Sequence, residues 1–262
     1  MKCTISMTQF AASLAECMGV EPPAQAAPAH PLLANLLEGN GLRQAERVLI
    51  YNPDATGMWL YHKRPELFLP MLTHTQLAVP TRTVLPSVTP VCFGTMYTGV
   101  EPSVHGIQRY EKHVLEQESL FDCLAAAGKR CAIVAVRDSS MDILYSQAPV
   151  DHFIEEYDEQ ATERGCELLR AGEYDVVVVY NQEYDDVMHR TYPESNISLA
   201  AVGHYVEAFD ALCEAAERGW KDKNVLVCWA TDHGTHIGDS GNGCHGSDRD
   251  EDVNVLHFFG VL

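Results

Sequence analysis

Five short runs of nearly uninterrupted apolar residues recur along the chain, and segments with helical spacing separate most of them. The runs cover residues 47–52, 130–136, 174–181, 224–232 and 253–260. Such runs are typical of strands in a sheet that is covered on both faces. Apolar positions with helical spacing occupy residues 119–129, 157–172 and 197–219. This alternation predicts an α/β fold with a doubly wound, mostly parallel central sheet and helices on both faces.

The N-terminal part has a different pattern. Residues 5–19 have helical spacing and run into prolines at 22 and 23, after which an Ala/Pro-rich connector continues to residue 31. The pattern predicts a helix followed by a linker within residues 1–31. Because 262 residues suffice for one large domain with a substantial core, we expect residues 1–262 to form a single α/β domain.

The charge balance is strongly acidic. The chain has 37 Asp and Glu residues against 18 Lys and Arg residues, a net charge of −19. A field of this sign repels nucleic acid and anionic membranes, so we expect neither as a partner. A small phosphate-bearing substrate needs local positive charge, and bound metal ions can supply it. A homo-oligomer is compatible with this sequence.

The N-terminus and the cysteines indicate a cytoplasmic protein. The first residues lack a strong basic start and a small-residue cleavage site, so we expect no signal peptide. No window approaches eighteen uninterrupted apolar residues, so we expect no transmembrane helix. The nine cysteines are an odd number without CxxC spacing. This favours reduced thiols over a disulfide framework or a thiolate zinc site.

Aspartates and histidines follow three of the five apolar runs. Asp54 follows the first run, Asp185 and His189 follow the third, and Asp232 and His233 end the fourth. Taken singly, an aspartate after a strand is usually a helix cap or a turn residue. Ligands of doubly wound sheets bind beyond the carboxyl ends of the strands. Three strands that deliver such residues to one edge therefore indicate metal ligands around one cleft.

The spacing within each pair is compatible with one ion. Asp185 and His189 lie four residues apart, so a helix would place both on one face and direct Asp186 elsewhere. Asp232 and His233 are adjacent, so both reach one ion only if they lie on an irregular loop.

A glycine-rich, acidic segment, residues 238–252, contains His245. We expect His245 to complete the set of Asp and His ligands. We interpret the acidic residues 248–252 as a flexible, solvated loop.

Residues 84–107 are rich in hydroxyl groups and prolines. We expect a short helix over residues 92–99 that begins near Thr89. A helix N-terminus favours anions, and a hydroxyl beside a divalent ion can become a nucleophile. In the alternative interpretation, Thr89 only caps the helix.

These motifs, in this order, resemble the alkaline phosphatase superfamily, specifically its type I phosphodiesterase/nucleotide pyrophosphatase branch. The nucleophile motif of that branch is similar to Pro86-Ser87-Val88-Thr89, followed by Gly99, Pro102 and His105-Gly106-Ile107. The resemblance covers about residues 47–260. It implies an alkaline phosphatase-like core, and the chain has no room for a large cap domain.

The resemblance also implies two divalent cations and a covalent mechanism. One ion would be held by Asp185, His189 and His245, and the other by Asp54, Asp232, His233 and the Thr89 oxygen. Nitrogen and carboxylate ligands suit Zn²⁺, which we expect first, or Mn²⁺. Thr89 would attack phosphorus, and a phospho-threonine intermediate would then be hydrolysed.

Two departures from the family pattern concern substrate binding. Tyr110 stands where phosphodiesterases usually have an Asn that binds a phosphate oxygen. Arg109 or Lys112 could bind the phosphate instead, although solvent-exposed positions are the simpler expectation for both. Cys92 replaces another usual Asn, and we interpret it as a small buried residue rather than a catalytic thiol.

A third departure concerns the ends of the chain. Residues 7–23 resemble the helix that follows the last strand in relatives, so we hypothesise that the N-terminal helix occupies that place. In the alternative, it is an ordinary additional helix. If helix 5–19 packed far from strand 253–260, the hypothesis would be wrong. Segments 137–170 and 190–200 are the only candidate lids, which favours a small or exposed phosphoester.

The leading hypothesis is therefore a two-metal hydrolase of phosphodiesters or phosphomonoesters. The first alternative is a phosphonate hydrolase or phosphomutase that uses the same metals. The second is a non-catalytic, metal-stabilised binding protein, which would have no need of a nucleophile.

Overall fold

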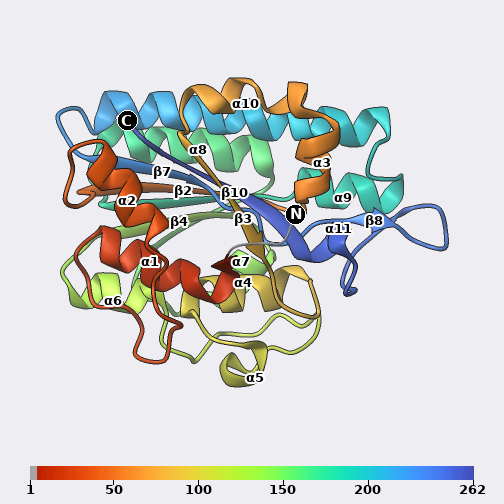
Figure 1. Cartoon of the computed structure of the whole chain (residues 1–262), viewed down its shortest axis with the longest axis horizontal. Helices are drawn as coiled ribbons and strands as arrows, with labels where there is room; N and C mark the ends of the chain where they lie inside the picture. The colour runs from red at the N-terminus through yellow and green to blue at the C-terminus, as the bar shows by residue number, and fades with distance from the viewer. Residues whose placement is uncertain (1–4) are drawn as a thin grey trace.

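An eight-stranded sheet forms the centre of the molecule, and helices lie on both of its faces (Figure 1). The computed structural model describes residues 5–262. Strand β10 is antiparallel to both of its neighbours, and every other pairing in this sheet is parallel. The strand order is β1 (Ile5–Ser6), β3 (Leu77–Arg82), β10 (Asn254–Val261), β7 (Val225–Trp229), β2 (Arg47–Pro53), β6 (Val176–Asn181), β4 (Cys131–Val136) and β5 (Asp151–Glu155). The predicted doubly wound, mostly parallel α/β fold is confirmed.

The central strands are apolar because each of their faces is covered by a helical layer. All residues of β4, β6 and β7 are buried. Burying one Val or Leu side chain contributes about 1.5–3 kcal/mol, so these strands supply much of the stability. Two apolar clusters fill the two sides of the sheet. No separate cap domain is present within residues 5–262.

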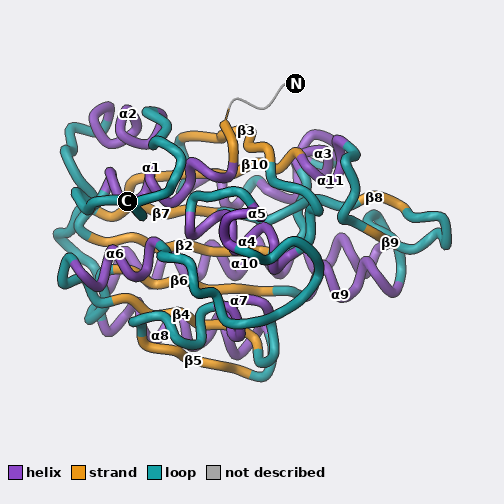
Figure 2. Tube along the Cα trace, turned by 90° about the horizontal axis from the view of Figure 1, so that it is seen from below, coloured by secondary structure: helices purple, strands orange, loops and turns teal. Residues whose placement is uncertain are grey.

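The helices divide into two layers, one on each face of the sheet (Figure 1), and Figure 2 looks onto the sheet from one of these layers, with the strands following one another from β3 and β10 to β5. One layer contains α8 (Asp158–Ala171), α10 (Asn196–Gly219), α3 (Met58–Lys63), η2 (Pro65–Phe68) and η3 (Pro70–Thr73). The other contains η1 (Met7–Gln9), α1 (Phe10–Cys17), α2 (Leu32–Gly39), α4 (Thr89–Thr98), α6 (Leu120–Ala126) and α7 (Ser140–Leu144). The short helix α5 (Pro102–His105) follows α4.

Three neighbouring strands deliver the candidate ligands to one edge of the sheet. In the order β7-β2-β6, Asp232 lies after β7, Asp54 after β2 and Asp185 after β6. Asp185 belongs to helix α9 (Glu183–Arg190). Because β10 is antiparallel, its first residues reach the same edge, where α11 (Asp250–Val253) and the β8–β9 pair (His236–Ile237, Gly243–Cys244) lie.

Several local predictions were wrong. Segment 137–170 is no lid, because β5 pairs with β4 and α8 packs on the sheet. Residues 248–252 are not simply a solvated loop, because they enter α11 and Asp252 is completely buried. The predicted helix 5–19 is divided into β1, η1 and α1. The remaining segment proposed as a lid, 190–200, runs into α10 and keeps that role only as a prediction.

The N-terminal helix packs against the last strand of the sheet. The Phe10 ring lies edge-on to His257 at 5.6 Å and is 6.5 Å from the Phe259 ring. The condition on which the hypothesis depended, proximity of this helix to strand 253–260, is therefore met. That α1 fills the place of the relatives' C-terminal helix, and that residues 1–262 form a single domain, stay predictions.

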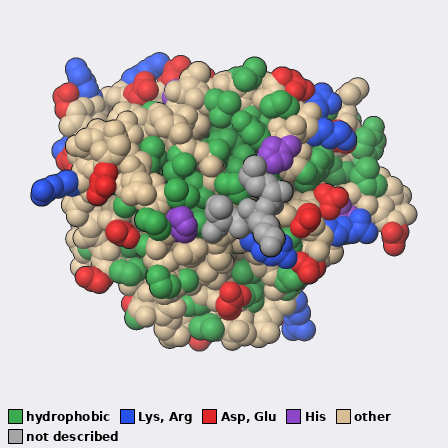
Figure 3. Space-filling model, in the orientation of Figure 1, with side chains coloured by type: hydrophobic (Ala, Val, Ile, Leu, Met, Phe, Trp, Pro, Cys, Tyr) green, Lys and Arg blue, Asp and Glu red, His purple; other side chains and the backbone are tan. Residues whose placement is uncertain are grey.

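The surface and the cysteines can be compared with expectation. On the face drawn in Figure 3, basic side chains lie in separate small groups, in agreement with their scatter along the sequence. The eight cysteines within residues 5–262 are free thiols, and Cys3 lies outside that range. Across the same residues, no helix combines the length and the apolar character needed to cross a bilayer.

Candidate metal centre

Asp54, Asp232 and His233 form a fully buried group, here called the inner set. His233 Nε2 lies 3.5 Å from Asp54 Oδ1 and 3.3 Å from Asp232 Oδ2. All three residues are at most 2% exposed. Their ligand atoms lie within 4.8 Å of one another, which is close enough for a single ion.

Backbone geometry after β2 builds the inner set. The amide of Asp54 donates to the Asn181 carbonyl at 2.9 Å, so the parallel ladder continues one step beyond β2. Ala55 then turns with φ 67°, in the left-handed region that costs a non-glycine residue about 1–2 kcal/mol. This turn directs the Ala55 amide to Asp232 Oδ1 at 3.1 Å. The strained turn thus ties the ends of two neighbouring strands together.

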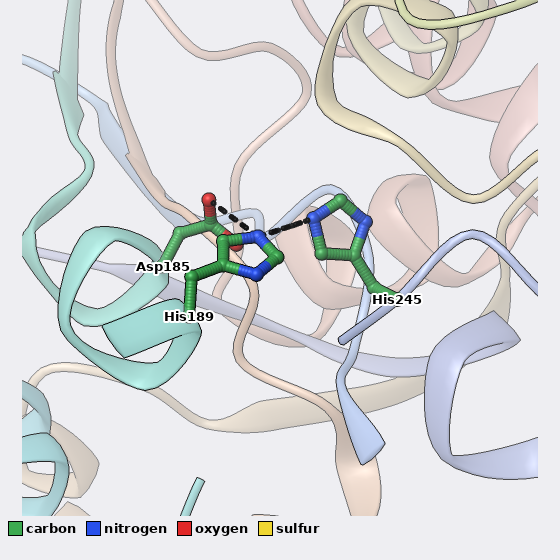
Figure 4. A group of neighbouring side chains, drawn as sticks. All are labelled: Asp185, His189 and His245. Atoms are coloured by element: carbon green, nitrogen blue, oxygen red, sulfur yellow. Dashed lines mark hydrogen bonds and ion pairs between the residues drawn. The ribbon is translucent and has the colours of Figure 1, made fainter. Parts of the chain in front are cut away.

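Asp185, His189 and His245 form a second group, here called the outer set (Figure 4). His189 Nε2 lies 3.4 Å from Asp185 Oδ2 and 3.0 Å from His245 Nε2. His245 Nε2 lies 3.4 Å from Asp185 Oδ1. The predicted placement of Asp185 and His189 on one face of a helix is confirmed, and Asp186 instead accepts a hydrogen bond from Tyr157.

Backbone carbonyls orient both outer imidazoles. His189 Nδ1 lies 3.1 Å from the Gly243 carbonyl, and His245 Nδ1 lies 3.0 Å from the Ser87 carbonyl. A carbonyl only accepts, so each Nδ1 carries a hydrogen, and in the neutral ring each Nε2 presents a lone pair to the site. This division of roles between the two ring nitrogens is typical of metal-ligating histidines.

The two sets adjoin each other and the candidate nucleophile. The His233 and His245 rings stack with centroids 4.0 Å apart. Thr89 Oγ1 lies 3.2 Å from His233 Nε2 and is buried. All seven predicted site residues therefore meet at one edge of the sheet.

Thr89 is the first residue of α4, and the cap residue of that helix is Val88. The alternative interpretation of Thr89 as a capping side chain is therefore wrong. Pro90 is the second residue of the helix and has no amide hydrogen. Amides in the first turn have no partner within the helix, so a proline is well tolerated there. The nucleophile candidate thus sits at the positive end of the helix dipole.

Burial makes the charges of the inner set costly. It raises the pKa of Asp54 well above its ordinary value, and the nearby Asp232 carboxylate raises it further. Burial also raises the pKa of Asp232 to about 7. Burial lowers the pKa of His233, which keeps this imidazole neutral. These shifts describe carboxylates that lack a compensating positive charge.

In the outer set, the imidazoles offset the negative charge of the carboxylate more fully than in the inner set. Burial acts to raise the pKa of Asp185, but the hydrogen bond that a protonated His189 donates and the imidazoles of His245 and His233 bring it below its ordinary value. The hydrogen bond to Asp185 raises the pKa of His189. Burial lowers the pKa of His245 to about 4, so this ring is a neutral donor of a lone pair.

Three buried carboxylate oxygens without a hydrogen-bond partner among the described residues indicate whether these residues fit a cation. Asp54 Oδ1, Asp185 Oδ1 and Asp232 Oδ2 are buried and have no hydrogen-bond partner within residues 5–262. A buried unpartnered carboxylate oxygen is costly, and a metal ion at these atoms would remove that cost. The donors are carboxylate oxygens and imidazole nitrogens, the types that bind Zn²⁺ and Mn²⁺. The residues therefore fit divalent cations.

A family model described as type I phosphodiesterase / nucleotide pyrophosphatase matches residues 59–244, more than half of the chain. The chain belongs to this family. The resemblance to the alkaline phosphatase superfamily is thereby confirmed. The matched range contains Thr89 and four of the candidate ligands, whereas Asp54 and His245 lie just outside it.

Solved structures share the phosphodiesterase-family fold. Phosphonoacetate hydrolase from Sinorhizobium meliloti 1021 is similar with a TM-score of 0.57 and 16% identity, over 73% of this chain and 57% of that chain. Murine ectonucleotide pyrophosphatase / phosphodiesterase 5 is similar with a TM-score of 0.59 and 16% identity, over 74% of this chain and 59% of that chain. Both likenesses show the fold alone, and this chain spans less than two thirds of either protein. No curated protein matches the chain in sequence.

The three residues predicted to bind substrate in this phosphodiesterase-family chain lie in different surroundings. The Arg109 side chain is 81% exposed and pairs with Glu111 at 2.8 Å. Lys112 Nζ donates to the Asp138 carbonyl at 2.7 Å and lies 5.8 Å from the Tyr110 ring centre. Partial burial raises the pKa of Tyr110, and the Asp54 and Asp185 carboxylates raise it further. Tyr110 is thus within electrostatic reach of the site, whereas Arg109 is committed elsewhere.

The sequence reasoning missed two buried residues, Tyr180 and Asp252, that hold side chains or backbone near the two donor sets. Tyr180, at the end of β6, donates a hydrogen bond to Asp54 Oδ2. Asp252 accepts hydrogen bonds from the Ser247 amide at 2.9 Å and from His236 Nδ1 at 2.6 Å. The position of Tyr180 in a strand next to Asp54 was a usable signal once the strand order was known. Nothing in the local sequence distinguished Asp252 from its exposed acidic neighbours.

Proposed function

We propose that the protein is a metal-dependent hydrolase of small phosphodiesters or phosphomonoesters. The observation that carries the proposal is the convergence of Thr89 with two donor sets at one sheet edge. Asp54, Asp232, His233 and the Thr89 oxygen would hold one divalent cation, and Asp185, His189 and His245 the other. Zn²⁺ is the first expectation, and Mn²⁺ is the alternative.

The proposed reaction has two displacements at phosphorus. Thr89 Oγ1 attacks phosphorus in line, a new P–O bond forms, and the ester oxygen leaves and takes up a proton as the alcohol. Water then attacks the phospho-threonine, which frees Thr89 and releases the phosphate product. Bound cations would supply positive charge that stabilises the phosphoryl oxygens and lowers the pKa of a hydroxyl beside them.

The chain's own residues have distinct parts in this scheme. The start of α4 places the Thr89 hydroxyl where the helix dipole favours an anion. The carbonyls of Gly243 and Ser87 hold the outer imidazoles in the tautomer that leaves Nε2 free. Tyr110 is 61% exposed and is the remaining candidate for contact with the substrate.

Thr89→Ala tests the proposal. A hydrolase that uses Thr89 as the nucleophile should lose turnover of p-nitrophenyl phosphate and bis-p-nitrophenyl phosphate by roughly a thousandfold or more. The variant should keep two metal ions per chain by elemental analysis. Thr98→Ala is a matched control, because the Thr98 hydroxyl in the same helix donates to the Gly94 carbonyl and accepts from the Val100 amide, and neither partner belongs to the donor sets. Full turnover by Thr89→Ala would refute the covalent mechanism.

A phosphonate hydrolase is the second candidate. It is supported by the structural similarity to a phosphonoacetate hydrolase, which shares only the fold at 16% identity. A substrate panel containing phosphonoacetate, a diester and a monoester separates the two activities. A phosphomutase would transfer phosphate within a substrate without releasing it, and a metal-stabilised binding protein would turn over none of them.

The cellular setting is also part of the proposal. The described cysteines are free thiols, and most of them are buried, which suits a reducing compartment such as the cytoplasm. The net charge of −19 disfavours nucleic acid and anionic membranes as partners.

A further inference from the structure

The two oxygens of Asp54 have different surroundings. Oδ2 accepts a hydrogen bond from the Tyr180 hydroxyl. Oδ1 lies 3.5 Å from His233 Nε2 and has no hydrogen-bond partner among residues 5–262. The two oxygens of Asp232 differ in the same way. Oδ1 accepts a hydrogen bond from the Ala55 amide, and Oδ2 has no hydrogen-bond partner in the described chain. Each inner carboxylate thus has one oxygen held by the protein and one directed to the site.

Strand register brings the Tyr180 hydroxyl to Asp54. Strands β2 and β6 are parallel neighbours in which Asn52 is paired with Tyr180. Side chains alternate along a strand, so Asn52 and Asp54 share one face of the sheet with Tyr180. Tyr180 therefore reaches Asp54 diagonally across the two strands. A carboxylate that binds a cation is ionised and has no hydrogen, so the phenol is the donor.

Packing fixes the Tyr180 ring and keeps it away from a substrate. Tyr180 is only 2% exposed. The Phe93 ring meets it edge-on, with centroids 5.4 Å apart and an angle of 87° between the planes. Phe93 lies one turn after Thr89 in α4. The Tyr180 side chain thus packs between its own strand, β6, and helix α4, which carries Thr89. From there it can act on the site only through Asp54.

We infer that Tyr180 is a positioning residue that makes Asp54 a single-oxygen ligand of the inner cation. The inference rests on the two-ion site of the proposed function. The hydroxyl fixes the rotation of the carboxylate, so that Oδ1 faces the cation before it binds. Without the hydroxyl, Oδ2 becomes a second unpartnered buried oxygen and the carboxylate is free to turn. Removing such a partner of a metal ligand typically costs ten- to hundredfold in metal affinity.

Tyr180→Phe tests the inference, because it removes the hydroxyl and keeps the ring. Zn²⁺ affinity is measured by competition with a chromophoric chelator, independently of turnover. We expect one of the two ions to bind ten- to hundredfold more weakly and the other to bind as in the wild type. The same titration in a His189→Ala background, which leaves only the inner set complete, assigns the loss to the inner ion.

Tyr145→Phe is the matched control. Tyr145 is also 2% exposed, and its hydroxyl donates to the Phe93 carbonyl at 2.8 Å rather than to a ligand. This variant removes the same atom from the core and should keep both zinc affinities. A loss of thermal stability shared by both variants, with affinity reduced only in Tyr180→Phe, supports positioning over a general packing role.

A second comparison tests whether Tyr180 acts through Asp54. Asp54→Ala removes the group through which Tyr180 acts, so adding Tyr180→Phe to it should reduce zinc affinity no further. Wild-type affinity at both sites in Tyr180→Phe, or an undiminished effect in the Asp54→Ala background, would overturn the inference. If the wild type binds two ions but hydrolyses no ester, the proposed function fails while a Tyr180-dependent affinity still stands.

Discussion

At the scale of single residues, the site is built from groups that are costly to bury. Asp54 and Asp232 are almost inaccessible to solvent, and each keeps one oxygen without a hydrogen-bond partner in the described chain. Such groups persist where function requires them, because an apolar replacement would be easier to bury. Not every polarisable group at the site has a chemical role, however.

Cys92 lies near the site but has no chemical role there. It accepts a hydrogen bond from the Thr83 hydroxyl at 3.0 Å, and burial raises its pKa well above the ordinary value. Its thiol therefore stays protonated and unreactive at neutral pH. We expect Cys92→Ala to keep turnover within about twofold and to lower the free energy of unfolding by about 1 kcal/mol. Enzyme assays and urea denaturation check this, and a large loss of turnover at unchanged stability would contradict it.

At the scale of elements, helix α9 depends on a partner from another helix. Its own first residues provide no side-chain cap. Instead Asp158, the first residue of α8, accepts hydrogen bonds from the Gln182 and Glu183 amides at 2.9 and 2.8 Å. The outer ligands Asp185 and His189 belong to α9, so Asp158 holds in place the helix that carries them.

Asp158 also makes stability depend on pH. Burial raises its pKa from the ordinary 3.8 to about 7. The folded state then holds the proton that the unfolded state releases, so this contribution to stability is complete below about pH 4 and is lost as the pH rises through 7. The loss between pH 5 and pH 7 is roughly 2 kcal/mol.

Asp158→Asn should remove that pH dependence. The amide cannot ionise, so the difference in unfolding free energy between wild type and variant should shrink from pH 5 to pH 7. Urea denaturation at several pH values measures it. Asp142→Asn is a suitable control, because Asp142 in α7 also accepts a hydrogen bond from a backbone amide, that of Asp138, but is only partly buried. A constant difference across this range would show that Asp158 does not titrate there.

At the scale of the whole molecule, the two metal sets differ in access to solvent. The inner set is enclosed by the ends of β2 and β7, whereas the His189 side chain of the outer set is 42% exposed. An ion in the inner set can leave only after local opening of the structure, which an outer ion does not need. The strongly acidic chain also slows the approach of anionic chelators.

We therefore expect a chelator to remove the two ions in two phases. The outer ion should leave at least about tenfold faster than the inner ion. Stopped-flow mixing with a metal-sensitive chelator, with elemental analysis after the first phase, measures both steps. The fast phase should be missing in His189→Ala. A single phase that releases both ions together would contradict the difference in access.

The elements that could be predicted from the sequence are those whose pattern is local. Strands β2, β4, β6 and β7 are buried on both faces, so each reads as an apolar run. Strand β5 lies at the edge of the sheet and is only partly buried, so its sequence DHFIE has no such run. Strand β3 contains Pro80, which also disguises it. An apolar-run criterion therefore finds the centre of the sheet and misses its margins.

The sequence by itself determined which residue types stand at the strand ends, in which order, and with which spacing. That was enough to predict Asp54, Asp185, His189, Asp232 and His233 as ligands, because helical spacing and strand ends are properties of neighbouring residues, whereas His245 was expected from its place in a glycine-rich loop and the role of Thr89 from the family resemblance. Only the tertiary structure decided which oxygen or nitrogen of each side chain is free to bind. The partners that hold the other atom, such as the Tyr180 hydroxyl and the Gly243 carbonyl, come from segments far away in the chain. No local pattern can encode a hydrogen bond whose two ends meet only after the sheet has formed.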